Sequence, residues 1–363
     1  MKLRPMKFVW LVVALAIATV AVLSVYPSLL PQTNRLVLQA PYVQIIAIRG
    51  MQAIVLVLAA LFLFIVSVVR RTVLDRGRIA LGLAVVLVAC AGFHGGLMFS
   101  RGLTNHETLS PDSGITQAGA GDGSITVMQY NTEGGKVSRE ELADLVEANG
   151  VDVITLVETS QSMGAELVQE LAARGLTFVQ FDNDQSRYAA DWGSSVILVS
   201  TGLGDYAPID VPPSLAQTGV PVVALAPASG QGPKIVVVHP VAPAGWGALT
   251  GLSNERLATW RAQVTASYDL CTQMPDAIIA GDFNSTADHE QALGARGCRD
   301  AMNQAGSGGL GTWPSNLPTL LSSPIDRIMS PSGYRGDQAL VTEAGQSDHR
   351  GIIVRLKPRS RAS

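Results

Sequence analysis

Side chains that can move protons or bind hard cations follow several apolar runs of this 363-residue sequence. In residues 277–286, AIIAGDFNST, a buried-strand pattern passes through Gly281 into Asp282 and Asn284. One such residue alone is an ordinary loop cap or surface group. In layered α/β proteins, however, strand ends meet at the crevice that binds ligands. Six expected strand ends carry these side chains and form a candidate site: Asn131, Glu158, His239, Asp282, Asn284, Asp326, Asp348 and His349.

An α/β scaffold is expected to position these residues. Apolar runs bounded by Gly and Pro predict strands at 124–130, 151–158, 194–200, 220–226, 234–240, 277–280, 326–330 and 350–356. Helices are expected after a capping box at Ser138 and Glu141, at about 164–173, and at about 254–271. Strands alternate with helices early and cluster late. The pattern favours two packed sheets with helices outside.

Six segments, taken together and in this order, resemble the endonuclease/exonuclease/phosphatase superfamily in a membrane-anchored bacterial form. They are QYNTE (129–133), ITLVET (154–159), VVVHP (236–240), IIAGDFNST (278–286), SPIDRIM (323–329) and GQSDHRGI (345–352). Each is short and weak alone. The resemblance implies a four-layered α/β sandwich, with two packed β-sheets between helices, and metal-dependent hydrolysis of a phosphoester.

The resemblance also implies a role for each site residue. Glu158 is the principal ligand of Mg²⁺ or Mn²⁺, and Asn131 and Asp348 complete or support the metal site. Such cations prefer oxygen ligands and keep several waters, so a few carboxylates and amides suffice.

The remaining residues are expected at the phosphate. Asp282 orients or deprotonates the attacking water, and Asn284 donates a hydrogen bond to the phosphoryl oxygens. His349 contacts the phosphate as base or cation, while Asp326 fixes its tautomer. His239 is the second histidine there, and which histidine is the acid is left open.

Three apolar stretches near the N-terminus, at about 8–26, 50–69 and 79–99, are each long enough to cross a hydrocarbon core of about 30 Å as a helix. Lys and Arg gather before the first stretch and between the second and third. Positive residues stay on the cytoplasmic side of a membrane, so the N-terminus is expected in the cytoplasm and everything after Phe99 on the outer side. The protein is therefore expected to be a multi-pass protein of the cell membrane. A signal peptide is the alternative for the first stretch, but no convincing cleavage site precedes Tyr26.

The domains follow from composition. Residues 1–100 are expected to form a membrane anchor, 101–123 a flexible linker rich in Gly, Ser and Thr, 124–358 the catalytic domain and 359–363 a tail. An even cysteine count in an exported domain predicts a Cys271–Cys298 disulfide. His94, inside the third stretch, is expected to pack between helices, and His289 to lie at the surface.

Charge limits the substrate classes. From Ser100 onward, 17 basic residues face 28 acidic ones, a formal balance of −11. Proteins that grip long nucleic acids usually have a basic surface. The expected partners are the bilayer and a phosphoester, which is a nucleic acid, a phospholipid headgroup or a small molecule. The sequence indicates no protein partner. A catalytically silent binding or anchoring module that retains the fold is the alternative function, although all eight site residues are present.

Overall fold

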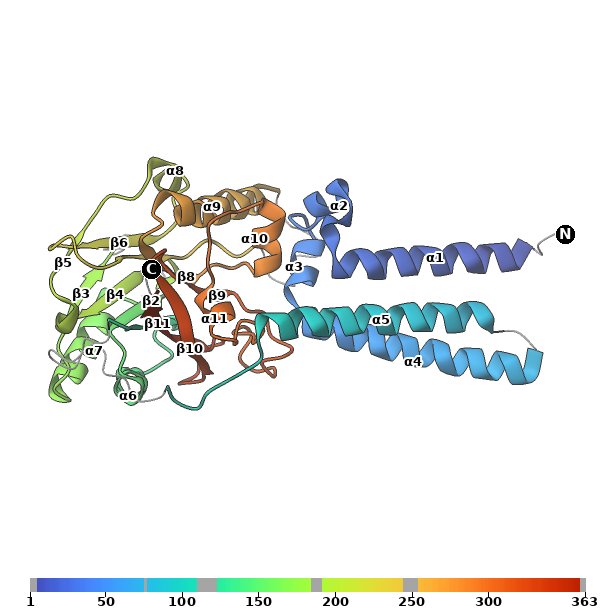
Figure 1. Ribbon diagram of the computed structural model, residues 1–363, viewed down its shortest axis with the longest axis horizontal. Helices are drawn as coiled ribbons and strands as arrows, with labels where there is room; N and C mark the ends of the chain where they lie inside the picture. Colours follow the sequence, from blue (N-terminus) through green and yellow to red (C-terminus); the bar gives the residue numbers. More distant parts are fainter. Residues whose placement is uncertain (1–4, 75–76, 110–122, 184–190, 244–253, 360–363) are drawn as a thin grey trace. The chain divides into compact units, whose positions relative to one another are not determined.

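The chain has two compact units, Met1–Ser100 and Arg101–Ser363. The computed structural model describes residues 5–74, 77–109, 123–183, 191–243 and 254–359 (Figure 1). Of the expected tail, only Arg359 is among them.

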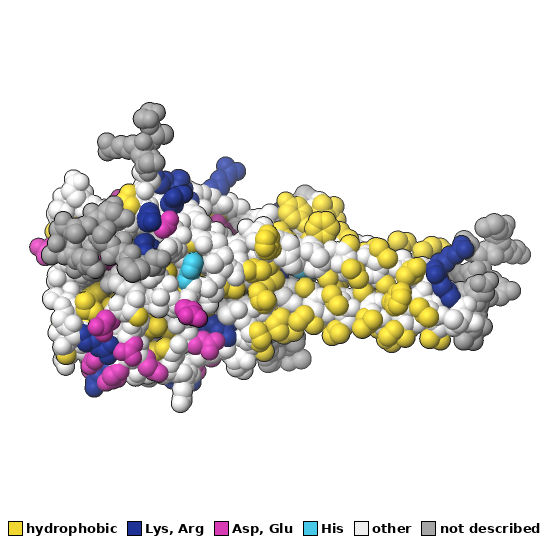
Figure 2. Space-filling view, turned by 60° about the horizontal axis from the view of Figure 1, so that its bottom comes forward, with side chains coloured by type: hydrophobic (Ala, Val, Ile, Leu, Met, Phe, Trp, Pro, Cys, Tyr) yellow, Lys and Arg dark blue, Asp and Glu magenta, His cyan; other side chains and the backbone are white. Residues whose placement is uncertain are grey.

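Three long apolar helices dominate the first unit: α1 (Pro5–Val25), α4 (Arg49–Leu74) and α5 (Arg78–Arg101). Each contains a stretch long and apolar enough to cross a membrane, at Phe8–Val25, Arg49–Thr72 and Arg78–Arg101. Hydrophobic side chains cover the long helices in Figure 2. Shorter helices lie between α1 and α4: η1 (Pro27–Leu29), α2 (Pro31–Leu36) and α3 (Tyr42–Ala47).

His94 joins these three helices. Its side chain is fully buried, and its Nε2 lies 3.1 Å from the Ser24 Oγ of α1. Its Nδ1 lies 3.1 Å from Nη1 of Arg49 in α4. The residue therefore has the packing role expected from the sequence.

Two sheets pack face to face in the second unit. The strands of the first sheet, in spatial order, are β10 (Tyr334–Thr342), β11 (Gly351–Pro358), β1 (Ile125–Asn131), β2 (Val153–Val157), β4 (Ser195–Ser200) and β3 (Phe178–Asp182). The second contains β5 (Tyr206–Pro208), β6 (Val222–Pro227), β7 (Lys234–Val238), β8 (Ala277–Asp282) and β9 (Asp326–Met329). This is the expected sandwich of two sheets flanked by helices.

The main core lies between the sheets, where Val127 and Val153 of the first sheet pack with Val237 and Ile278 of the second. Helices α6 (Arg139–Asn149) and α7 (Gln161–Ala173) supply a second core on the other face of the first sheet, through Leu142 and Leu167. Helix α6 begins with the predicted capping box. The remaining helical elements are η2 (Asp191–Gly193), η3 (Thr201–Leu203), α8 (Pro213–Ala216), α9 (Asn254–Gln273), α10 (Ala287–Leu293) and α11 (Ala301–Gln304).

Strand direction brings the polar strand ends together. β1 and β2 are parallel, as are β7 and β8, so the residues at their C-terminal ends lie at matching edges. β9 and β11 run antiparallel to β8 and β1, so they begin where those strands end. Asp326, the first residue of β9, is directly paired with Asp282, the last residue of β8.

Residues 101–109 form the start of the expected flexible linker, 101–123. They belong to the second unit and contact the rest of it: Arg101 pairs with Asp288 through bonds of 2.6 and 3.0 Å. Asn105 donates to and accepts from the backbone of Val341, and Leu109 is buried. Polar composition concealed these contacts because Asn105 caps an exposed strand edge rather than entering the core. Residues 110–122 lie outside the described part of the chain.

Removing residues 101–109 is expected to destabilise the second unit. A fragment that starts at residue 110 loses the buried Leu109 side chain and the Asn105 hydrogen bonds, which together contribute about 3 to 5 kcal/mol. Urea unfolding of fragments 101–363 and 110–363 measures the difference. Asn105→Ala in the longer fragment separates the strand-edge contribution, and equal unfolding midpoints for the two fragments would show that the contacts are unimportant.

Cys271 and Cys298 form a disulfide, 27 residues apart in sequence. It joins the end of α9 to the segment after α10, on either side of β8. By the loop-entropy relation, a link of this span stabilises the domain by about 3.5 kcal/mol.

Candidate active site

The end of β8 places Asp282 between the two sheets. Gly281 makes this possible, because a Cβ there would lie 1.9 Å from the Val238 carbonyl oxygen at the end of β7. Asp282 is buried, and its Oδ1 accepts the Asn284 N–H at 2.8 Å. The Asn284 side-chain amide donates to the Pro240 carbonyl at 2.9 Å and to Asp282 Oδ2 at 3.3 Å. In this arrangement Asn284 positions Asp282.

Asn131 and Glu158 come from the neighbouring ends of β1 and β2. The Asn131 Oδ1 accepts the Glu133 N–H at 3.0 Å, which directs its amide nitrogen into the site. That nitrogen donates to Glu158 Oε1 at 3.0 Å and to Asp282 Oδ2 at 3.2 Å. Glu158 and Asn284 have positive φ angles, 50° and 45°. Non-glycine residues hold this conformation only where the surrounding structure enforces it, which occurs often at functional sites.

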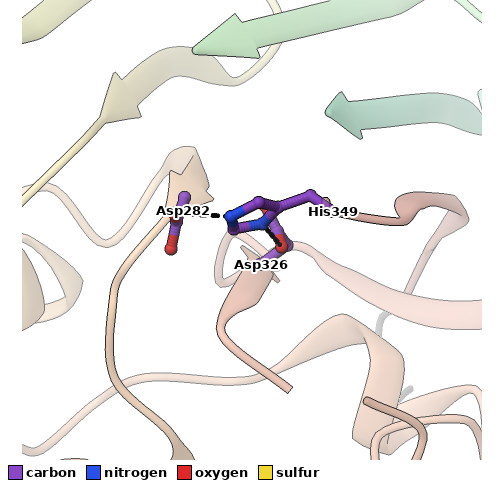
Figure 3. Close-up of side chains that lie close together, drawn as sticks. All are labelled: Asp282, Asp326 and His349. Atoms are coloured by element: carbon purple, nitrogen blue, oxygen red, sulfur yellow. Dashed lines mark hydrogen bonds and ion pairs between the residues drawn. The ribbon is translucent and has the colours of Figure 1, made fainter. Parts of the chain in front are cut away.

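Each of the two site histidines, His239 and His349, has its Nδ1 bound to an oxygen and its Nε2 near carboxylates. The His349 Nδ1 lies 2.8 Å from Asp326 Oδ2 (Figure 3), and the His239 Nδ1 lies 2.8 Å from the Trp192 carbonyl oxygen. The His349 Nε2 is 3.7 Å from Asp282 Oδ2, and the His239 Nε2 is 3.8 Å from the same oxygen. Asp282 therefore lies between two imidazoles, and the oxygen bound at each Nδ1 fixes the tautomer of that ring.

Contacts join all eight predicted residues at this edge. Besides those above, the His239 Nε2 is 3.5 Å from Glu158 Oε1, and the His349 Nε2 is 3.8 Å from Asp348 Oδ1. The two sheets contribute equally: Asn131, Glu158, Asp348 and His349 adjoin strands of the first, and His239, Asp282, Asn284 and Asp326 adjoin strands of the second.

Electrostatics favour a positive charge in this acidic site. Burial, with the Asp326 carboxylate beside it, raises the pKa of Asp282. Burial alone would lower the pKa of His349, but Asp326 and Asp282 outweigh it and raise the pKa to about 10. Burial also raises the pKa of Asp348. Each carboxylate thus gains from a nearby cation, whether imidazolium or metal.

The donor set fits a hard divalent cation. Ligand atoms of Asp282, Asp326 and His349 lie within 4.8 Å of one another, but the Asp326 Oδ2 is already paired with the His349 Nδ1. Glu158 and Asp348 are better ligands for a cation that keeps water, because their side chains are 25% and 48% exposed. Asn131 turns its amide nitrogen toward Glu158, so it supports that carboxylate instead of offering its oxygen.

Two residues near the site were not singled out from the sequence. The Trp313 Nε1 donates to Asp348 Oδ2 at 2.8 Å, from 35 positions earlier in the chain. The Glu133 Oε2 accepts the Asp348 N–H at 2.7 Å, and its Oε1 pairs with Lys136. Glu133 stands within the QYNTE segment, so its acidic side chain two positions after Asn131 was an available signal. No local pattern marks Trp313.

His289 is not at the surface, contrary to the sequence expectation. Its side chain is buried, and its Nδ1 accepts the Thr286 N–H at 2.9 Å in a capping box that begins α10. The ring also makes an edge contact with Trp260. The usual capping box has Glu or Gln at this position, so a histidine there was not recognised.

Comparison with solved structures finds distant similarity. An endonuclease/exonuclease/phosphatase from Bacteroides vulgatus is 12% identical over 65% of this chain and 99% of its own, with a TM-score of 0.46. A 3'-5' exonuclease from Neisseria meningitidis is 17% identical over 63% and 98%, also with a TM-score of 0.46. A mannosyl-6-phosphatase from Bacteroides thetaiotaomicron is 14% identical over 64% and 99%, with a TM-score of 0.44.

Comparison with curated proteins gives no match. The sequence profile of the Endonuclease/Exonuclease/phosphatase family, in contrast, matches residues 128–349, more than half of the chain. The matched range begins in β1 and ends at His349, so it includes every residue of the site. The protein belongs to the endonuclease/exonuclease/phosphatase family, whose members are hydrolases that act on phosphoester bonds.

Proposed function

We propose that this chain is a membrane-anchored, divalent-metal-dependent phosphoesterase whose catalytic domain faces away from the cytoplasm. The observation that carries the proposal is the contact of Asp282 Oδ2 with Asn131 and its approach to both histidines, in a site that also holds Glu158. An anionic ester repels hydroxide, so its hydrolysis needs an oriented water and positive charge at the phosphoryl oxygens.

Each side chain then has a defined task. Mg²⁺ or Mn²⁺ held by Glu158 and Asp348 would neutralise charge on the phosphoryl group and the leaving oxygen. Asp282 orients the attacking water and accepts its proton. His349, held by Asp326 at 2.8 Å, and His239 present Nε2 to the phosphate. Asn284 holds Asp282 through its backbone N–H.

The activity is tested with the full-length protein in detergent. The substrate panel is DNA, RNA, sphingomyelin, phosphoinositides and bis-p-nitrophenyl phosphate, each with Mg²⁺, Mn²⁺ or EDTA. We expect turnover of at least one substrate that EDTA abolishes. Activity that survives EDTA would refute metal dependence, and turnover of none would favour a binding module.

Orientation is tested separately. Arg70 and Arg71 lie near the end of α4, and Arg78 is the first residue of α5. These basic residues flank the connection between the two helices, which supports a cytoplasmic position for it. Alkaline phosphatase fused after Ser363 is expected to be active, because it folds only outside the cytoplasm. Activity of a C-terminal reporter in the cytoplasm alone would overturn the orientation.

A further inference from the structure

Arg350, directly after His349, is buried and uses all five of its guanidinium hydrogens. One bond goes from Nε to Glu343 Oε1, at 2.5 Å. The other four go to one loop: Nη2 donates to the carbonyls of Ser315 and Leu317 at 2.5 and 2.6 Å, and Nη1 donates to Ser322 Oγ and the Pro314 carbonyl at 3.2 and 3.4 Å. We call residues 312–322 the tryptophan loop, after Trp313.

The tryptophan loop contacts the residues on both sides of His349. The Trp313 Nε1 donates to the Asp348 carboxylate at 2.8 Å, and the Ser315 N–H donates to the Asp348 carbonyl at 2.7 Å. The Thr312 carbonyl accepts the Arg350 N–H at 2.9 Å. The backbone of the segment that presents His349 is therefore tied to the loop at two points.

The same loop contacts the partner of His349. The Thr312 Oγ1 accepts the N–H groups of Asp326 and Ile325, at 3.2 and 3.3 Å. Asp326 in turn holds the His349 Nδ1. Thr312 and Trp313 thus connect both acidic residues that flank His349 to a single loop, Asp326 through its backbone N–H and Asp348 through its carboxylate.

The middle of this loop is held by turns of its own and by a few hydrogen bonds to the rest of the domain. A single bridge pairs Trp313 with Ser323, no strand or helix lies between these two residues, and the side chains from Trp313 to Leu321 are all half-buried or exposed. An anchored loop of this kind depends on a few specific bonds. Arg350 supplies four of them from a planar group with fixed directions, which lysine cannot reproduce.

We propose that Arg350 is a positioning residue: it fixes the tryptophan loop so that Trp313 orients Asp348 and Thr312 orients Asp326, with His349 between them. The inference rests on the proposed phosphoesterase function of the site. Arg350 itself does not contact the phosphate. Loss of the Arg350 guanidinium hydrogen bonds displaces Asp348 and Asp326, whose carboxylates orient the His349 imidazole.

The test uses Arg350→Lys in the full-length protein, with bis-p-nitrophenyl phosphate and Mn²⁺. We expect kcat to fall by about 10- to 100-fold, the usual cost of losing an outer support of a catalytic group, with KM changed by less than about threefold. Arg355→Lys is the matched control, because Arg355 is equally buried on β11 but away from the loop. It should keep kcat within about twofold of wild type.

A double-mutant cycle separates positioning from general destabilisation. Trp313→Phe keeps an aromatic ring at this position and removes the indole N–H that donates to Asp348. If Arg350 acts through this contact, Trp313→Phe lowers kcat in the wild type but adds less than about twofold in Arg350→Lys. Effects that multiply, or an equal kcat loss in Arg355→Lys, would overturn the inference.

Hydrogen exchange gives a readout that does not require turnover. The Ser315 amide should exchange at least about tenfold faster in Arg350→Lys, while amides of β6 stay unchanged. Unchanged Ser315 exchange, or faster exchange with unchanged kcat, overturns the positioning role. If the wild type does not hydrolyse bis-p-nitrophenyl phosphate, the kinetics are measured on whichever panel substrate it does hydrolyse; a wild type inactive on the whole panel refutes the proposed function and the catalytic part of this inference, and Ser315 exchange then decides whether Arg350 holds the loop.

Discussion

Asp282→Asn is expected to lower kcat by about 10³-fold, because an amide cannot accept the proton of the attacking water. Its shape is nearly that of the carboxylate, so the bond from the Asn284 N–H at 2.8 Å is retained. Both histidines and Asn131 surround Oδ2, which makes this oxygen the centre of the proposed chemistry. Initial rates on whichever panel substrate the wild type hydrolyses measure the loss.

The same variant is expected to be more stable than the wild type without metal. Burial and Asp326 raise the pKa of Asp282, so at neutral pH its ionised form is less favourable in the folded protein than in the unfolded chain. Asparagine removes that charge, and we expect a gain of about 1 kcal/mol in the free energy of unfolding in EDTA at pH 7. Asp276→Asn, at an exposed residue that pairs with Lys234, is the control. More than a tenth of wild-type kcat in Asp282→Asn would exclude Asp282 as the base.

Glu158→Gln is expected to raise the metal concentration for half-maximal activity by about 100-fold or more, since a neutral amide is a poor ligand for Mg²⁺ or Mn²⁺. Glutamine has the size of glutamate and can still accept the Asn131 hydrogen bond, 3.0 Å long in the wild type. The loss is therefore one of charge and not of packing. Activity measured against Mn²⁺ concentration gives the shift.

Calorimetric titration with Mn²⁺ checks the same prediction without a substrate. Heat of binding should disappear in Glu158→Gln over the range in which the wild type saturates. Glu166→Gln is the matched control, because Glu166 is half-exposed and pairs with Arg139 on the surface of the domain. Wild-type affinity in Glu158→Gln would assign the cation to other carboxylates.

The sequence predicted which polar strand ends lie together better than it predicted their surroundings. Strand ends such as Asp282 and His239 stand beside long apolar runs, so their burial follows from local composition. Contacts such as Trp313 to Asp348 depend on how a loop returns across the sheet edge, 35 positions away. Short-range patterns carry no information on that return, and a motif search reaches only residues within each motif.

The strands that the sequence did not predict, β3, β5 and β10, lie at the edges of their sheets. β3 and β10 are the outer strands of the first sheet, and β5 is the outer strand of the second. Their sequences, FVQFD, YRGDQALVT and YAP, mix polar residues into short or bulged runs. An edge strand buries less surface and is selected against flat apolar pairing, so it lacks the pattern that identifies a central strand.

The equal division of the site between the two sheets has a consequence for the folding chain. Four of the eight site residues adjoin strands of the first sheet, and the other four adjoin strands of the second. Half of the domain, however well formed, holds either Glu158 without Asp282 or Asp282 without Glu158. In the proposed phosphoesterase, activity therefore requires both sheets to be packed together, and we expect a nascent or partly unfolded chain to be inactive.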